Sequence, residues 1–349
     1  MDQRANCASI SAAGAYGSCS RMHPAQLSVP EKQNSATCYP NYPSRTSPAI
    51  CWEIFEYPPE QMLDDRQTAE FAGCDVGQPH RVSMKRTSLF IAVPAYDRRI
   101  YTDTSVAIMD TVMQLRDRKA AASVFFMRGC AIVHHARNMI VSEFLANKDA
   151  THLLFVDSDM KFEARTILNM LRCEVPFVAA PYVAKSYRNL PTRTVQPRDL
   201  NAFHEAAVNW NVVFEDAGVM TGAIPPKDVR NNFARVKRIG TGLMLLRRDV
   251  LETMVRKYQH TEYRAGDSDE FPYAVNRFYD LFSTRIDETG LFIGEDFAFC
   301  DRWINECGGE IWCDLTAKVS HMGHHEYTGT LADYLAIHRG IRKRAETPA

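Results

Sequence analysis

The stretch Thr151-His-Leu-Leu-Phe-Val-Asp-Ser-Asp159 places two acids directly after an apolar run. The run, Leu153 to Val156, is typical of a short strand buried on both faces of a parallel sheet. It stops at Asp157 and Asp159, with Ser158 between them. Ligands of open α/β sheets bind beyond the carboxyl ends of the strands, so the sequence predicts a binding site here.

Two carboxylates beside a dry sheet end need a compensating charge, and a hard divalent cation held by oxygen atoms can supply it. Bound Mg²⁺ or Mn²⁺ would leave coordination positions open for phosphate oxygens. This reasoning predicts a metal-bridged nucleotide-diphosphate site. The Asp-x-Asp pattern is short, however, and by itself it fits a solvated turn with an N-cap aspartate equally well.

The composition excludes several classes of protein. The chain has 349 residues and a formal net charge of −1, which gives no indication of a nucleic-acid surface. No segment reaches the roughly 20 consecutive apolar residues of a membrane span. The ten cysteines include no Cys-x-x-Cys pair, which argues against a zinc site of that type. We therefore expect a cytoplasmic protein without an integral membrane span.

The chain divides into three parts by pattern. Residues 1–85 are rich in Ser, Pro and turn signals and lack the apolar core of a secretory signal, so we expect a largely irregular extension. Residues 86–335 carry the regular patterns of a folded domain, and 336–349 are interpreted as a tail. The length suffices for one large domain with a full core.

Strands and helices alternate between residues 88 and 160. Apolar runs at 89–93 and 122–127 precede two predicted helices, and each helix shows an apolar face at helical spacing. The first predicted buried face is Val106, Met109 and Met113, and the second is Ala136, Ile140 and Phe144. This alternation predicts a doubly wound, mostly parallel sheet flanked by helices.

The second half contains further candidate elements. We expect a strand at 175–183 followed by Lys185 in a polar loop, and an antiparallel insertion over 189–236 in which Trp210 could stack on a sugar. Gly240 and Gly242 favour a close backbone approach before an apolar strand. The sequence also predicts that Asp249 caps a helix through Val255, that Glu295-Asp296 opens another helix, and that His321 follows a late strand.

In combination, these pieces resemble the GT-A nucleotide-sugar glycosyltransferases, and the family 2 enzymes in particular. The resemblance rests on the strand ending in Asp157-Ser158-Asp159, on the Glu295-Asp296 helix start and on His321. Three further runs are similar to that group as well: Ala136-Arg137-Asn138 before the strand, and Ala180-Pro181-Tyr182 with Lys185 and Gly240-Thr241-Gly242 after it. It covers about residues 88–330 and implies a Rossmann-like GT-A fold.

The resemblance also implies roles for individual residues. Asp159, Asp157 and His321 would hold Mn²⁺ or Mg²⁺ against the diphosphate, and Asp296, beside Glu295, would be the catalytic base. As an anion at a helix N-terminus, Asp296 should be favoured by the helix dipole. The residues implied to contact the nucleotide or its sugar are Pro94, Ala95, Tyr96, Asp97, Arg137, Ser158 and Lys185. The implied reaction is an inverting transfer from a nucleotide-diphosphate sugar to a saccharide, lipid-linked or protein acceptor.

Other interpretations fit parts of the same pattern. A nucleotidyltransferase also combines an α/β sheet with metal-binding acids, although no glycine-rich phosphate loop follows the first strand. A non-catalytic nucleotide- or carbohydrate-binding protein would tolerate Asp296→Ala, and a metal hydrolase would be expected to space its histidines on a helix. Glu295 and Asp296 also fit ordinary first-turn acids, and His321 also fits a core histidine.

Overall fold

A computed structural model of the chain describes residues 87–187, 207–264 and 275–346. The described residues all belong to one compact unit, Gln78–Ala349. The predicted extension 1–85 lies outside them. Helix α8, Leu331–Glu346, continues across the position where we predicted a tail to begin.

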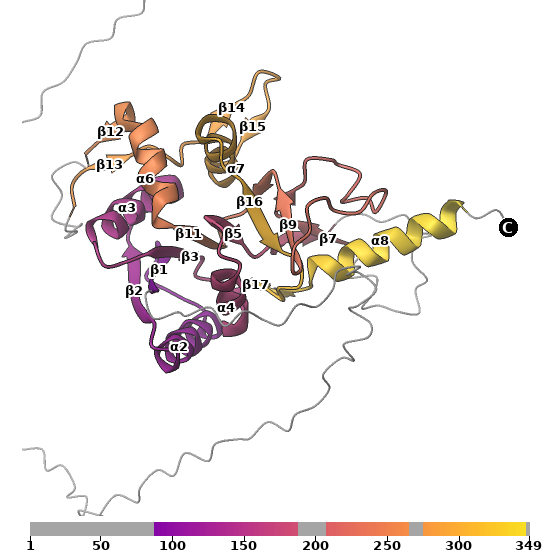
Figure 1. The fold of residues 1–349 in the computed structure, drawn as a ribbon, viewed down its shortest axis with the longest axis horizontal. Helices are drawn as coiled ribbons and strands as arrows, with labels where there is room; N and C mark the ends of the chain where they lie inside the picture. The colour runs from indigo at the N-terminus through magenta and orange to yellow at the C-terminus, as the bar shows by residue number, and fades with distance from the viewer. Residues whose placement is uncertain (1–86, 188–206, 265–274, 347–349) are drawn as a thin grey trace, which may run out of the picture. The chain divides into compact units, whose positions relative to one another are not determined.

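A seven-stranded mixed sheet forms the centre of the fold, as Figure 1 shows. Five strands run in one direction, and β11 and β9 run against them. The predicted α/β class is therefore confirmed. In spatial order the strands are β2 (Ala121–Arg128), β1 (Ser88–Ala95), β3 (His152–Val156), β11 (Leu243–Arg247), β5 (Phe177–Ala179), β16 (Ile311–Asp314) and β9 (Phe233–Val236).

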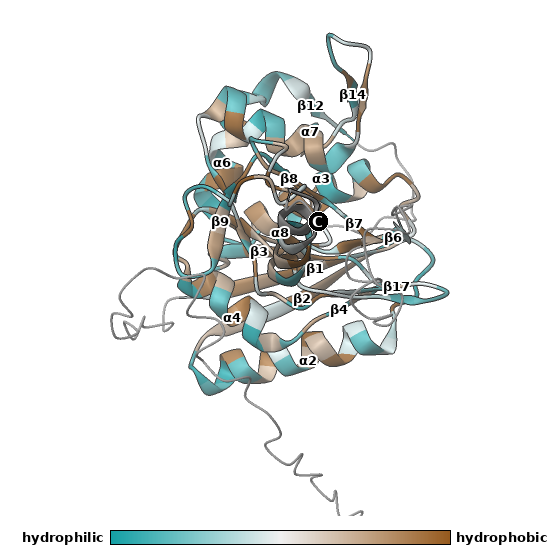
Figure 2. Ribbon diagram, turned by 90° about the vertical axis from the view of Figure 1, so that its right-hand side faces the viewer, coloured by the Kyte–Doolittle hydropathy of each residue, from teal (hydrophilic) through white to brown (hydrophobic). Residues whose placement is uncertain are grey.

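Helices cover both faces of this sheet (Figure 2). One face packs against α2 (Thr102–Asp117) and α4 (Ala164–Arg172). The other packs against α3 (Val133–Ala146), α6 (Arg248–Lys257) and α7 (Glu295–Asp301). The side chains of β1 alternate between the two cores, as the period of two in a strand requires. Each face thus has its own apolar core.

The predicted buried face of α2 is wrong. Val106, Met109 and Met113 are each more than half exposed, whereas Ala107 and Leu115 are buried. Thr111 lies on the buried face as well, where its hydroxyl donates to the Ala107 carbonyl. Because the Thr111 hydroxyl has its hydrogen-bond partner within the helix, this polar residue can face the core.

The structure corrects three further local predictions. The run at 175–183 gives only the short strand β5, and Lys185 lies in a separate strand, β6 (Val183–Tyr187). Asp249 lies inside α6 and pairs with Arg247 instead of capping the helix. Trp210 is buried, with its ring edge-on to Tyr334, and is therefore a core residue rather than a sugar platform.

Short strand pairs surround the carboxyl end of the main sheet. The pair β6–β7 supports the predicted antiparallel insertion, within the described residues. These elements are β4 (Met160–Lys161), β17 (Ser320–Met322), β18 (Glu326–Tyr327), β7 (Val208–Trp210), β8 (Val212–Val213), β10 (Arg238–Ile239), β12 (Glu262–Tyr263), β13 (Phe278–Tyr279), β14 (Arg285–Ile286) and β15 (Phe292–Ile293). Among the described helices, none combines the length and apolar character that a bilayer crossing needs.

Candidate functional site

The turn after β3 is fixed by backbone hydrogen bonds from both sides. The Asp157 N–H donates to the Gly242 carbonyl over 3.0 Å. The Ser158 carbonyl accepts from the Tyr101 N–H and from the Thr104 hydroxyl, at 2.9 and 3.1 Å. The two acids of the turn therefore project from a rigid edge, next to the loop that follows β1.

The residues predicted to contact a base lie at that loop. Pro94 and Ala95 are the last residues of β1, and Tyr96 is 62% exposed. Asp97 accepts a hydrogen bond from the Arg99 side chain at 2.8 Å. The exposed Tyr96 ring is the surface here that a planar ligand could cover.

Arg137 joins two of the predicted motifs. Its guanidinium, in the middle of α3, is 2.7 Å from Glu295 and 3.3 Å from Asp157, and the side chain is only 4% exposed. Burial opposes its charge, but the attraction of Asp157 and Glu295 outweighs burial and raises the pKa of Arg137. A buried cation is thus held between two acids that are far apart in the sequence.

Asp159 lies between two basic side chains. The Lys185 ammonium is 2.5 Å from its Oδ2, and Nε2 of His321 is 3.5 Å from its Oδ1. Burial opposes ionisation of Asp159, yet the hydrogen bonds and charges of these neighbours hold its pKa below the ordinary value. The pairing of β4 with β17 sets Met160 opposite His321, which explains how His321 reaches Asp159.

The hydrogen bonds of His321 fix its tautomer. Nδ1 lies 3.0 Å from the Val183 carbonyl, which can only accept, so Nδ1 carries the proton. When the ring is protonated, Nε2–H also faces Asp159 and can donate to it; in the neutral ring Nε2 presents a lone pair to the same oxygen instead. Two lone pairs that face each other are the donor arrangement for a cation, and the carbonyl partner orients the ring as in many histidine metal ligands.

Asp159 and His321 fit a divalent ion as partial ligands only. In the described part of the chain, no three His, Cys, Asp or Glu residues form a group that could hold an ion. Asp157, predicted as a further ligand, has one carboxylate oxygen at Arg137. An ion here would take its other ligands from phosphate and water, as Mg²⁺ commonly does.

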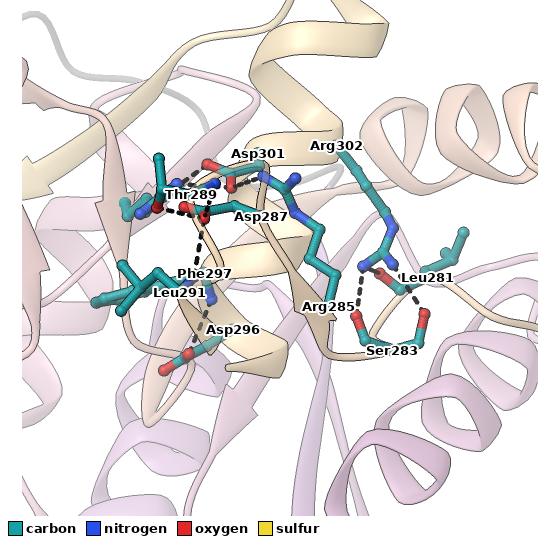
Figure 3. A network of polar contacts seen from close by, with 11 residues as sticks. Leu281, Ser283, Arg285, Asp287, Thr289, Leu291, Asp296, Phe297, Asp301 and Arg302 are labelled. Atoms are coloured by element: carbon teal, nitrogen blue, oxygen red, sulfur yellow. Dashed lines mark hydrogen bonds and ion pairs between the residues drawn. The ribbon is translucent and has the colours of Figure 1, made fainter. Parts of the chain in front are cut away.

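Asp296, in the first turn of α7, has no cationic partner within ion-pair distance among the described side chains. Its Oδ2 accepts from Asn211 at 3.1 Å and its Oδ1 accepts from the Phe297 N–H at 2.8 Å, the contact drawn in Figure 3. Burial and the charge of Glu295 raise the pKa of Asp296, against the weaker opposing effects of Arg137 and the hydrogen bonds. We expected the helix dipole to favour its ionisation, but burial acts more strongly in the other direction.

Asn211 is a part of the site that the sequence did not reveal, and its partner Tyr182 belongs to the Ala180-Pro181-Tyr182 run. The Asn211 amide donates to the Tyr182 hydroxyl at 2.7 Å as well as to Asp296. A Cβ at Gly240 would lie 2.1 Å from the Asn211 amide nitrogen, and one at Gly242 would lie 2.8 Å from the Tyr182 ring. The predicted close approach at the two glycines is confirmed, and its cause is the packing of Tyr182. Tyr182 was already part of the family resemblance, whereas for Asn211 the Gly-Thr-Gly run, which predicted a close approach, was the one indirect signal.

A network of ion pairs fixes the position of α7. Asp301 is 4% exposed and accepts two hydrogen bonds from Arg238, at 2.7 and 2.9 Å. Arg285 of the β14–β15 hairpin lies 2.5 Å from the same carboxylate (Figure 3). Burial opposes ionisation, but the two arginines lower the pKa of Asp301. Helix α7 then continues as a π-helical turn, Arg302–Glu306, a feature often found near functional sites.

Comparisons with known proteins give structural likenesses only. No family model matches the chain, and no curated protein matches it. Similar solved structures include A197 from STIV, with 13% identity over 71% of this chain and 92% of the other, at a TM-score of 0.39. A mutant Drosophila β-1,4-galactosyltransferase 7, solved with manganese, UDP-Gal and xylobiose, has 13% identity over 75% of this chain and 76% of its own, at a TM-score of 0.31. The inositol-1-phosphate CTP transferase of T. maritima has 9% identity over 74% of this chain and 97% of its own, at a TM-score of 0.32. At these TM-scores we draw no functional conclusion from the likenesses.

Proposed function

We propose that the chain is a metal-dependent glycosyltransferase that moves a sugar from a nucleotide-diphosphate donor to an acceptor hydroxyl with inversion. One observation carries the proposal. Three pieces of sequence that are far apart meet at the carboxyl edge of β3: Arg137 binds both Asp157 and Glu295, and the β4–β17 pairing brings His321 to Asp159. Separate structural roles for these residues would not require them to meet.

Asp296 is the proposed general base. Deprotonating an attacking hydroxyl requires a carboxylate that is ionised and yet has appreciable proton affinity. Amide donors hold both oxygens of Asp296 in place, and its raised pKa increases its proton affinity. The hydroxyl would give its proton to this carboxylate as its oxygen attacks the sugar carbon, so no covalent nucleophile on the protein is required.

Positive charge on the opposite side of the site would stabilise the leaving group. Asp159 and His321 would hold a divalent ion, which when bound neutralises charge on the departing diphosphate. Lys185, which forms an ion pair with Asp159 in this structure, would contact phosphate oxygens. Pro94 to Asp97 would contact the nucleoside, and Arg137 would fix the relative position of the metal side and the base side.

Product analysis tests this function. The protein would be incubated with a panel of nucleotide-diphosphate sugars and Mn²⁺, and release of nucleoside diphosphate would be measured, since slow donor hydrolysis needs no known acceptor. We expect Mn²⁺-dependent release from one donor and its loss in Asp159→Ala. Pyrophosphate release from a nucleoside triphosphate and a sugar phosphate would instead support the nucleotidyltransferase alternative. Tight donor binding without any turnover would support the binding-protein alternative.

A further inference from the structure

A second cavity, of about 400 Å³, opens on the side of the sheet that carries α4. Its wall comes from the last turn of α4, from the turn before β9 and from the end of β16. None of the residues assigned to the candidate site lines it. Its volume falls within the range of about 300–1,000 Å³ that small-molecule sites occupy.

Two arginines of the cavity wall have no acidic partner. Arg172 has a hydrogen bond to the Asn169 side chain at 3.3 Å, and the Arg230 guanidinium lies 4.9 Å from the ring centre of Trp312. Neither arginine makes an ion pair in residues 87–187, 207–264 and 275–346. Arg235 of β9, by contrast, pairs with Asp228 and Glu310.

Among the described residues, Asp314 is the one acid in the cavity wall, and its carboxylate already accepts hydrogen bonds from neighbouring residues. It is 2% exposed, and its Oδ1 accepts hydrogen bonds from the N–H and hydroxyl of Thr316 and from the Ala317 N–H. Its carboxylate is thus turned to its own backbone loop. The wall therefore carries two guanidinium groups and one internally bonded carboxylate, an arrangement that favours an anion.

A tight turn fixes the backbone of Arg230. Arg230 and Phe233 exchange two backbone hydrogen bonds, at 2.7 and 2.8 Å, and the two residues between them have φ values of 48° and 68°. This is the geometry of a tight two-residue hairpin turn, for which asparagine is favoured. The Leu315 N–H also donates to the Asn232 carbonyl at 2.9 Å, which ties the turn to β16. The turn fixes the backbone of Arg230, and the exposed guanidinium lies over the Trp312 ring at the cavity.

We propose that this cavity is a second ligand site, for a small organic molecule that carries a phosphate or diphosphate group. Arg172 and Arg230 contact the phosphate oxygens, and the side chains of Val175 and Phe233 give the apolar part of the ligand a surface. The site differs from the proposed donor site in its residues and contains no candidate metal ligand pair. It would therefore bind its ligand without a divalent ion.

Calorimetric titration with inorganic pyrophosphate, in the presence of a chelator, tests the proposal. Because Lys185 could also bind this probe, the titration is made in full-length Lys185→Ala protein. We expect one site that Arg230→Gln or Arg172→Gln weakens at least tenfold. The matched control is Arg235→Gln, which removes an arginine of neighbouring β9 that does not line the cavity, and it should change the affinity less than twofold. Thermal melting of each variant checks that it is folded.

Two results would overturn the proposal. One is the absence of pyrophosphate binding to the folded Lys185→Ala protein. The other is an affinity in the folded Arg172→Gln and Arg230→Gln variants that equals that of the Arg235→Gln control. Either outcome leaves the proposed transferase activity untouched, because that activity is measured separately and at other residues.

Discussion

Two aspartates on one short helix, Asp301 buried and Asp296 half-buried, differ in almost everything except residue type. Asp301 receives three charged hydrogen bonds from Arg238 and Arg285, and its pKa is lowered. Asp296, five residues earlier, receives only neutral N–H donors and lies beside Glu295, and its pKa is raised. The first carboxylate is neutralised by its partners, and the second is left able to accept a proton.

The difference separates a structural acid from a candidate catalytic one. Pairs of titratable groups whose surroundings move their pKa values apart commonly mark acid and base assignments. Asp301 joins α7 to β10 and to the β14–β15 hairpin, and so sets the direction in which α7 begins. Asp296 lies at that beginning. The structural acid thus positions the proposed base.

Replacing Asp296 by Asn should have the largest effect. The amide cannot take a proton, and loss of a general base costs about 100- to 10,000-fold in rate. Folding stability should hold or increase, because removing a buried acid with a raised pKa removes its desolvation cost. Steady-state donor turnover and urea unfolding at neutral pH measure the two effects. Full activity in Asp296→Asn would assign the base elsewhere.

Replacing Asp301 by Asn should have the opposite effect on stability, which should fall. Loss of the carboxylate leaves Arg238 and Arg285 without their acid, and we expect a loss of about 3 kcal/mol, the low end for buried pairs because both arginines are partly exposed. Urea unfolding measures it. An equal loss of stability in Asp296→Asn and Asp301→Asn would remove the distinction between the two acids.

Gly240→Ala tests the support behind Asp296. The new methyl group would overlap Asn211 and Tyr182, and overpacking of this kind costs about 1–3 kcal/mol. Displacement of Asn211 should also lower turnover. Gly340→Ala is the matched control, since a Cβ there meets no atom within 4 Å and alanine favours a helix. If both variants melt alike, the close packing at Gly240 is unimportant.

The smallest effect is a pH dependence of stability. The folded pKa of Asp301 lies below its unfolded value of about 3.9, so its contribution is present above that pH and is lost as pH falls through the folded pKa. Asp296 has the reverse sign, since its raised pKa favours the folded state at low pH and this advantage disappears as pH rises through the folded pKa. The stability deficit of Asp301→Asn should therefore shrink as pH falls from neutral to about pH 3. A constant deficit would contradict the pairing.

The sequence predicted the fold correctly where the pattern of apolar residues left only one choice of buried face. The run Leu153 to Val156 is fully buried, and the α3 face of Ala136, Ile140 and Phe144 is buried as expected. The buried face of α2 was predicted wrongly because the helix has two apolar stripes at helical spacing. The stripe with alanine and threonine is the one that packs against the sheet. Choosing between such stripes requires the shape of the neighbouring surface, which a single sequence does not contain.

The site was predictable as a set of motifs but not as a set of contacts. Asp159 and His321 were named from their order along the chain. The strands that bring them together have only two and three residues, too few to recognise in the sequence. Asn211 lies in the insertion, where no periodicity marks it, although it holds Asp296. Contacts made by isolated side chains across long sequence separations leave no local pattern.

Electron paramagnetic resonance of Mn²⁺ with a nucleoside diphosphate tests the central claim most directly. We predict that the fitting diphosphate increases Mn²⁺ affinity in the wild type, and that His321→Ala and Asp159→Ala abolish this increase. The nearby histidine variant His324→Ala should retain it, since only His321 faces Asp159 among the described histidines. Equal Mn²⁺ binding by the His321→Ala and His324→Ala proteins, with or without diphosphate, would contradict a metal-nucleotide site at Asp159.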